Sequence, residues 1–594
     1  MLNKLIKKTN RKWWILGTVC FALLMIVLDG NVVNLAIPSI IDTFNASISQ
    51  VEWVNNAYLL VFAVFLITFG RLGDEFGRKK LFIIGLIVFV LGSMLCGISN
   101  SINQLIFFRC LQGFGGAAMM PATLSLITVS FKAKERGVAL GLWGAVAGVS
   151  IVLGPIIGGL LTEHGLGLAI NNFLGISEFW RYVFYINLPI GITAIVATLI
   201  IIPESRDREK KHPVDFLGIL LSGFSILLLT FAFIEGAKYG WWQALQAFSL
   251  FGWHIKFGNL SIVPVLFVLS IVFGILFFIW EKYKKHEPLV NIELFKERNY
   301  KAGNAVTAIL SFAMMGSFFL LPLFLQLILG LSPAKTGQYL IPLAVTIIMV
   351  VPLSGRLADK LGPRYLAFSG LLVMSIGLYI MSHFTINTSA HDLVLPFVIV
   401  GLGMGLIQAP ISSAVLKNVP EDKAGGASGV VTTIRQIGSI MGIAVLGAVL
   451  QSQMISSFNK SINQMSEVPT AMKTQISQQV SAGNAFRSSK AMQRQLNYAL
   501  NQQLQKAVPL PDLSELSPAQ KDVMIAKVQS RRQVLAKQFG SIGQKINMNV
   551  KKSFMDSLGD TLRMASLITL FGAGVSLFLQ NPQKRSKQAV VIKG

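Results

Sequence analysis

The sequence predicts an all-α integral membrane protein of fourteen transmembrane helices, arranged as two six-helix bundles plus two additional helices. The first observation is composition: 53% of the 594 residues are hydrophobic and only 13% are charged, too few charges for the surface of an ordinary soluble protein. The second is that apolar stretches of about 20 residues, the length that crosses a ~30 Å hydrocarbon core, recur along the chain. The third is a loop motif that occurs twice.

Fourteen apolar stretches account for the predicted helices. The first follows the basic segment MLNKLIKKTNRKWW and continues past the length of a signal-peptide apolar core, so we interpret it as a retained helix. In chain order the stretches cover approximately residues 13–36, 54–70, 80–99, 105–130, 137–161, 182–202, 214–236, 262–280, 303–328, 337–357, 365–384, 393–416, 426–452 and 562–580.

The basic residues follow the predicted membrane topology. A net charge of +25 raises the question of nucleic-acid binding, but the Lys and Arg residues gather at the N-terminus, in alternate loops and in the C-terminal tail. The loops on the opposite side carry few: Lys238, Lys256 and Lys335. This asymmetry is the positive-inside pattern, which places both termini in the cytoplasm and explains the charge without a nucleic-acid partner.

The repeated motif defines the predicted domain plan. GRLGDEFGRKK (Gly70–Lys80) returns as GRLADKLGPR (Gly355–Arg364), farther along than the ~200 residues that six short-looped helices need. Two extra helices therefore lie between two duplicated bundles. The predicted divisions are an N-terminal six-helix bundle (1–202), two linking helices with a cytoplasmic loop (203–302), the first five helices of the C-terminal bundle (303–452), an extracellular loop domain (453–560), and the last helix with a cytoplasmic tail (561–594).

The segment 453–560 is polar and rich in Gln and Ser. Ser517-Pro518 is typical of a helix start, and apolar residues follow it at helical spacing, from Val528 to Ile546. These features predict a mainly helical extracellular insertion, an amphipathic hairpin. A disordered tether is the alternative, because Ser, Gln and Lys dominate and aromatic residues are few.

Five motifs occur in order along the first six stretches. They are LDGNVVNLAIP (Leu28–Pro38), GRLGDEFGRKK (Gly70–Lys80), LIFFRCLQGFGGA (Leu105–Ala117), GVSIVLGPIIGG (Gly148–Gly159) and WRYVFYINLPIG (Trp180–Gly191). Together they resemble the motifs of the major facilitator superfamily, specifically its fourteen-helix drug:proton antiporter branch, over nearly all of residues 13–452 and the last helix.

The resemblance implies the major facilitator fold and proton-coupled export of hydrophobic or amphipathic compounds, that is multidrug efflux, by alternating access across the bacterial plasma membrane. The implied partners are small amphipathic substrates, protons and membrane lipids, with no cofactor, no metal and a monomeric state. Export of an endogenous lipid or fatty acid is the alternative within transport, and a non-transporting membrane sensor is a further one.

Asp29 and Arg109 are the predicted proton-coupling residues. Asp29 lies about 16 residues, or roughly 24 Å, into the first helix, where a carboxylate is costly unless it is paired or hydrated. Arg109 enters the fourth helix from the opposite side by about one turn, so the two side chains share a depth. We predict that Asp29 carries the proton and that Arg109 modulates its proton affinity; a permanent structural ion pair is the alternative. Glu235 is a secondary acid, which we interpret as interfacial rather than as a second carrier.

The repeated loops are a predicted cytoplasmic gate, formed by Gly70, Asp74, Gly77, Arg78, Gly355 and Asp359. The glycines permit a tight loop and Asp74 can face a helix N-terminus. The resemblance implies a latch that holds the outward-facing state. Topology alone would explain the basic residues but not Gly70 and Asp74.

A small-residue face on the fifth helix, with Gly154, Pro155, Gly158 and Gly159, matches the antiporter motif and predicts a hinge, with close packing alone as the alternative. The predicted substrate cavity is apolar with scattered hydrogen-bonding groups. Its candidates are Trp143, Phe312, Met315, Gln326 and Gln408.

Nothing in the sequence predicts an enzyme. No HExxH, GxSxG or phosphate-binding loop occurs with the required spacing. The six histidines are scattered over loops and helix ends, so they predict no metal site.

Overall fold

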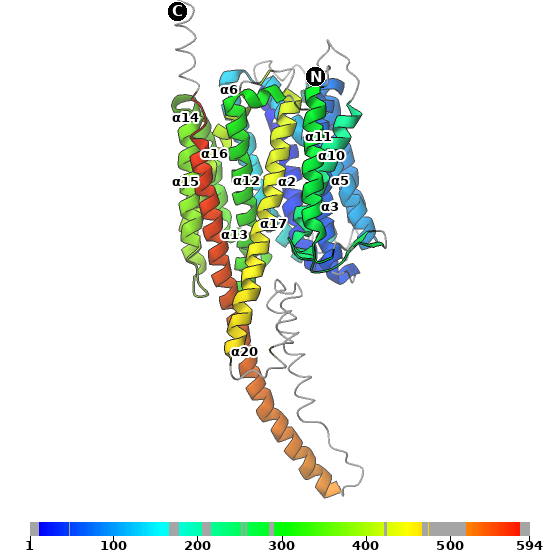
Figure 1. Cartoon of the computed structure of the whole chain (residues 1–594), viewed down its shortest axis with the longest axis vertical. Coiled ribbons are helices and arrows are strands. Elements are labelled where there is room, and N and C mark those ends of the chain that lie inside the picture. Colours follow the sequence, from blue (N-terminus) through cyan, green and yellow to red (C-terminus); the bar gives the residue numbers. More distant parts are fainter. Residues whose placement is uncertain are drawn as a thin grey trace, which may run out of the picture.

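The computed structural model shows a bundle of long helices from which two helices project at one end (Figure 1). It describes residues 11–44, 46, 48–164, 178–204, 215–250, 253–255, 258–283, 290, 292–417, 419–420, 424–465, 473 and 518–581.

The first half of the chain contains α2 (Arg11–Phe44), α3 (Ile48–Phe76), α4 (Arg78–Gly97), α5 (Ile102–Ser130), α6 (Ala133–His164), η1 (Phe179–Arg181), α8 (Tyr182–Tyr185) and α9 (Asn187–Ile201). Two linking helices follow, α10 (Phe216–Tyr239) and α11 (Ile262–Tyr283), with strands β1 (Phe248–Leu250) and β2 (Trp253–Ile255) between them. The second half contains η2 (Ile292–Lys296), α12 (Arg298–Leu323), η3 (Phe324–Ile328), α13 (Pro333–Tyr339), α14 (Ile341–Leu361), α15 (Pro363–Met381), η4 (Ala390–Leu393), α16 (Val394–Leu416), α17 (Ala424–Gln464) and α20 (Pro518–Ser576).

Eleven of the described helices are long and apolar enough to cross a membrane. In α3 and α6 the apolar stretches are shorter, Trp53–Leu66 and Val138–Ser150. The chain is therefore a multi-pass integral membrane protein.

The all-α prediction needs one correction. The antiparallel pair β1 and β2 joins Phe248 to Ile255 and Leu250 to Trp253. Aromatic residues favour strands, and the connection between α10 and α11 is rich in them. The sheet has only two strands, so the fold remains helical in character.

Each half has its own apolar core. In the first half, α5 packs on α3 and α4, and α2 packs on α6 and α9. In the second, α12 packs on α17, and α16 packs on α14 and α15, while α10 packs on α11. The halves meet where α6 contacts α13, α14 and α16, and where α17 contacts α3 and α5. Functional groups on α5, α6 and α17 are thus close to the boundary between the halves.

Helix α20 is continuous from Pro518 to Ser576, which confirms the helix start predicted there. At 1.5 Å per residue its 59 residues extend about 88 Å, far more than a bilayer needs. The predicted divisions at 452/453 and 560/561 fall inside α17 and α20, because both helices continue beyond the bundle (Figure 1). The two helices pack against each other, and Asn549 of α20 donates to Met465, one residue after α17.

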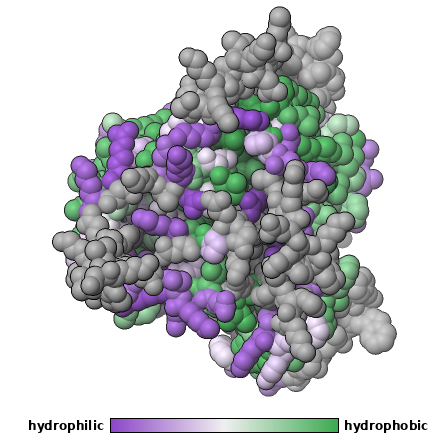
Figure 2. All heavy atoms as spheres, turned by 90° about the horizontal axis from the view of Figure 1, so that it is seen from above, coloured by the Kyte–Doolittle hydropathy of each residue, from purple (hydrophilic) through white to green (hydrophobic). Residues whose placement is uncertain are grey.

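Helix α2 begins and helix α20 ends at the same end of the bundle (Figure 1). There, Arg11 donates to the Ile201 carbonyl at the end of α9, and Arg298 donates to the Phe578 carbonyl just after α20. Figure 2 looks onto this end, where hydrophilic residues gather around apolar ones.

Candidate functional site

Asp29 and Arg109 form a buried ion pair between α2 and α5. Arg109 Nη1 lies 2.5 Å from Asp29 Oδ2, and the two residues are 1% and 0% exposed. The structure therefore brings together the two residues that the sequence placed at one depth. A charged pair in such a place is stable only when its remaining hydrogen-bonding positions are filled.

Neutral polar residues from three helices surround this pair. Gln112 Nε2 of α5 and Asn187 Nδ2 of α9 both donate to Asp29 Oδ1, at 2.8 and 2.7 Å. Asn187 also donates to Ser93 Oγ of α4, which donates to the Phe184 carbonyl. Asp29 thus accepts bonds from a cation and two amides, which hold the carboxylate at the centre of the first half.

Arg109 is fixed from its other side by α3. Its Nε donates to the Val54 carbonyl at 3.0 Å, and its guanidinium carbon lies 4.3 Å from the centroid of the Tyr58 ring, a cation–π contact. Arg109 Nη2 and the Tyr58 hydroxyl are buried and have no hydrogen-bond partner among the described residues. Both groups can form new hydrogen bonds if the helices rearrange.

The neutral members of this network were not predicted from the sequence. Gln112 lies three residues after Arg109 and so on the same helix face. Asn187 lies within the motif that opens the sixth predicted helix. Both positions were visible in the motifs, but neutral amides are not distinctive there until geometry shows what they contact.

The first gate loop is tied to the end of α9. Gly77 joins α3 to α4 with φ of 109°, a conformation that favours glycine, and a Cβ atom there would lie 2.6 Å from Glu204 Oε1. Lys79 donates its backbone N–H to the same oxygen at 3.2 Å and its Nζ to the Leu199 carbonyl at 2.9 Å. Glu204 is thus a member of the loop contact that the sequence did not indicate.

The other gate candidates lie near these elements. Gly70 and Gly355 are buried in α3 and α14, and Arg78 is buried at the start of α4. The side chains of Asp74 and Asp359 lie outside the described part of the structure.

Helix α6 approaches α2 very closely at the predicted hinge. A Cβ atom on Gly154 would lie 2.6 Å from the Cβ atom of Asn31, two residues after Asp29. Gly158 and Gly159 are also buried, and the side chain of Pro155 lies outside the described part. The antiporter-motif glycine thus sets the spacing between α6 and the helix that carries Asp29.

The same helix α6 contacts the second half along its length. Gly144 lies against Gln408 of α16, Gly148 against Ile347 of α14, and Ile156 against Gly337 of α13. From residue 144 to residue 156 these contacts extend over about 18 Å of α6. Helix α6 therefore links the Asp29 region to the boundary between the halves.

The predicted cavity residues are distributed around this boundary. Trp143 is fully buried on α6, where its Nε1 donates to Thr123 Oγ1 at 3.1 Å, and Gln408 faces the neighbouring Gly144. Phe312 and Met315 lie on α12, and Gln326 lies beyond it in η3.

Glu235 is 3% exposed on α10. Its neighbour Gly236 faces the Trp241 ring, so an aromatic residue does stand beside it, although the carboxylate is buried.

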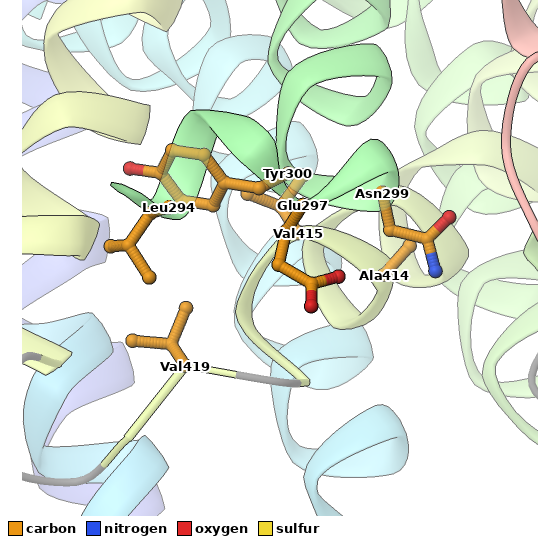
Figure 3. Close-up of a pocket in the computed structure, with 7 residues that line it drawn as sticks. All are labelled: Leu294, Glu297, Asn299, Tyr300, Ala414, Val415 and Val419. Carbon is orange, nitrogen blue, oxygen red and sulfur yellow. The ribbon is translucent and has the colours of Figure 1, made fainter. Parts of the chain in front are cut away.

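A small pocket lies at the end of the bundle where α12 begins. Figure 3 shows it between Glu297, Asn299 and Tyr300 on one side and Val415 and Val419 on the other. It has room for one water molecule at most, so it is too small to hold a substrate.

Comparison with known proteins identifies the family. Residues 19–443 match the Major Facilitator Superfamily. The chain belongs to this superfamily. It is therefore a transporter rather than an enzyme, as the sequence analysis predicted.

The similar proteins include exporters of drugs and antibiotics. The chain is 32% identical over 444 residues to the tetracenomycin C resistance and export protein of Streptomyces glaucescens, covering 75% of this chain and 77% of that protein. It is 31% identical to the multidrug transporter protein MdtP of Bacillus subtilis, covering 75% and 76%. It is also 30% identical to a riboflavin transporter of Clostridioides difficile, covering 73% and 87%.

Solved structures support the fold. A bacterial homolog of the human lysosomal transporter Spinster superposes with a TM-score of 0.51 at 17% identity, covering 97% of this chain and 100% of that chain. The human organic anion transporter MFSD10 superposes with a TM-score of 0.51 at 13% identity, covering 74% and 93%. These likenesses concern the fold alone.

Proposed function

We propose that this transporter is a proton-coupled antiporter that exports hydrophobic or amphipathic compounds by alternating access. In this proposal fourteen helices cross the bacterial plasma membrane, both termini lie in the cytoplasm and residues 453–560 lie outside. The asymmetric distribution of Lys and Arg supports the orientation. The drug and antibiotic exporters among its relatives support the substrate class.

The observation that carries the proposal is the buried Asp29–Arg109 pair. Ionised Asp29 is held by Arg109, Gln112 and Asn187. Proton binding to the carboxylate removes its negative charge and leaves Arg109 as an uncompensated buried cation, so the pair favours different helix arrangements in its two protonation states. A proton can therefore exchange in one arrangement and be withheld in another.

Contacts of α2 with α6 provide a route from this site to the substrate path. Asn31, two residues after Asp29, lies against Gly154 of α6, and α6 lies against α13, α14 and α16 of the second half. A small displacement of α2 would also displace α6, because the two helices are in close contact. In this way proton binding to Asp29 would shift the equilibrium between the open and closed arrangements of the two halves.

Purified protein in liposomes tests the proposal. A pH-sensitive dye inside the vesicles would report proton movement while ethidium, riboflavin and a neutral aromatic dye are offered as substrates. We expect an imposed pH gradient to drive at least one of these compounds uphill. Conversely, an imposed gradient of that compound should drive protons across the membrane in the opposite direction. Uphill transport that does not depend on the pH gradient and is driven by the gradient of another ion would contradict proton coupling.

A further inference from the structure

A second intramembrane arginine, Arg435, lies in the other half of the molecule. It is 11 residues after Ala424, the first residue of α17, or about 16 Å along the helix. Trp143, which faces it from α6, lies about 15 Å along its own helix. Both residues thus lie inside a ~30 Å hydrocarbon core, about 10 Å from the level of Asp29.

Among the residues that the structure describes, Arg435 has no anionic partner. Its guanidinium carbon lies 5.2 Å from the centroid of the Trp143 ring, and no ion pair or hydrogen bond joins the guanidinium to another described residue. Arg109 is held by a carboxylate, an amide and a carbonyl. A charged residue at this depth is costly without such partners and marks a functional site by default.

The surroundings of Arg435 place it at the boundary between the halves. Seven residues earlier, on the same face of α17, Ser428 donates to the Pro121 carbonyl of α5. Seven residues later, Gly442 lies against the Phe312 carbonyl of α12. Arg435 is half-buried between these two contacts, and the Trp143 ring beside it is oriented by its bond to Thr123.

We infer that Arg435 and Trp143 form a binding site for the carboxylate of an aromatic amphiphile. A guanidinium presents paired donors that fit a carboxylate, and the indole supplies an apolar aromatic wall beside them. Substrate sites of transporters built from two halves lie within the membrane at the boundary between the halves, and this pair lies at that boundary. The inference rests on the proposed export function and narrows its substrate class to include organic anions.

Equilibrium binding with a matched pair of probes tests the site. 1-Pyrenebutyrate and its neutral amide, 1-pyrenebutyramide, differ in the carboxylate alone, and binding to full-length protein in phosphatidylcholine nanodiscs requires no proton gradient. We expect Arg435→Gln to weaken pyrenebutyrate binding about tenfold or more, as loss of a charge-assisted bidentate contact implies, and to change amide binding less than about twofold. Arg435→Lys keeps the charge and should lose only part of the affinity.

Arg563→Gln is the matched control, because Arg563 is an exposed arginine of α20 paired with Asp560, and it should bind both probes as the wild type does. Dodecanoate, which has a carboxylate but no ring, should compete at least about tenfold less well than pyrenebutyrate because it lacks the stacking contact with Trp143.

Two outcomes would overturn the assignment. One is equal affinity of the wild type for the acid and the amide, and the other is an equal loss of affinity for both probes in Arg435→Gln. If Arg435→Gln cannot be recovered from the membrane, Arg435→Lys binding both probes as the wild type does would also overturn it. Arg435-dependent binding without proton-driven transport would refute the antiport proposal and leave this site standing.

Discussion

Asp29 is a buried acid whose carboxylate accepts hydrogen bonds from three side chains. The ion pair with Arg109 and the two amide donors leave each carboxylate oxygen bonded, so the group is organised rather than incidentally buried. Gln112 and Asn187 also carry amide oxygens, which can accept a bond from a protonated carboxyl group after a small rotation. The two amide side chains can therefore hydrogen-bond to Asp29 in both of its protonation states.

Asp29→Asn should abolish pH-driven efflux, because the amide keeps the size and hydrogen-bonding capacity of the side chain but cannot exchange a proton at neutral pH. Binding of a neutral substrate should survive, since binding and coupling are separable free-energy terms. Transport with and without a pH gradient, together with equilibrium binding, would measure both effects. Asp29→Glu, which keeps a titratable group, should retain part of the coupling; full gradient-driven efflux by Asp29→Asn would assign the proton to another acid, with Glu235 the next to test.

At this scale the sequence predicted the charged residues and not their neutral partners. Asp29 and Arg109 stand out because charges are rare in apolar stretches. Gln112, Asn187 and Ser93 carry no such signal, since polar uncharged residues occur on many membrane helices and only the packing of four helices shows that these three meet. Arg435 was a missed charge: it lies in the thirteenth stretch, but no acid elsewhere drew attention to it.

Helix α6 is the element that connects the two functional regions. Gly154 lets it approach α2 beside Asn31, and Gly144 and Gly148 let it approach α16 and α14. The sequence predicted a small-residue face on this helix but could not say which neighbours it serves, because packing partners depend on how the halves assemble.

Gly154→Ala should impair transport, by about tenfold or more if the α2–α6 contact must be close for coupling. The added Cβ would lie 2.6 Å from that of Asn31, so the helices must separate. Gly30→Ala is the matched control: it lies beside Asp29 on α2, and nothing stands within 4 Å of its added Cβ. Initial efflux rates at equal membrane abundance would compare them, and equal rates would dissociate this contact from coupling.

The loop between α3 and α4 is a second element whose contacts can be tested. Glu204→Gln keeps an acceptor for the Lys79 N–H, whereas Glu204→Ala removes it. If this contact helps to close the cytoplasmic side, Glu204→Ala should increase labelling of a cysteine placed at Ser412 on α16, which is buried. Glu204→Gln should label at close to the wild-type rate. Unchanged labelling in Glu204→Ala, together with normal transport, would argue against a gating role for this contact.

At the scale of the whole molecule, the projecting helices raise the question of which parts are needed for transport. The sequence predicted a separate domain over 453–560, but α17 and α20 continue from the bundle into that region without a break. A hydropathy pattern ends where the polar surface begins, so it could not show that the backbone remains helical. The buried residues Phe458 and Ile462 of α17 and Ile546 and Phe554 of α20 belong to the same core as the second half. The basal part of the projection is therefore structurally part of the bundle.

Removal of Val468–Gly540 should spare transport, because it leaves Ile462, Ile546 and the Asn549–Met465 contact in place. A flexible closure of about six to ten Gly and Ser residues should suffice, since the free-energy cost of closing a loop changes only slowly with its length. Efflux of ethidium in proteoliposomes, normalised to inserted protein, should stay within about twofold of the full-length rate, a change of under ~0.5 kcal/mol in the barrier.

A second deletion that extends to Phe554 is the informative comparison, because it also removes the buried contacts of α20 and should reduce the amount of folded protein. Complete loss of efflux in the shorter deletion, with normal insertion and normal substrate binding, would mean that the projecting segment takes part in substrate release.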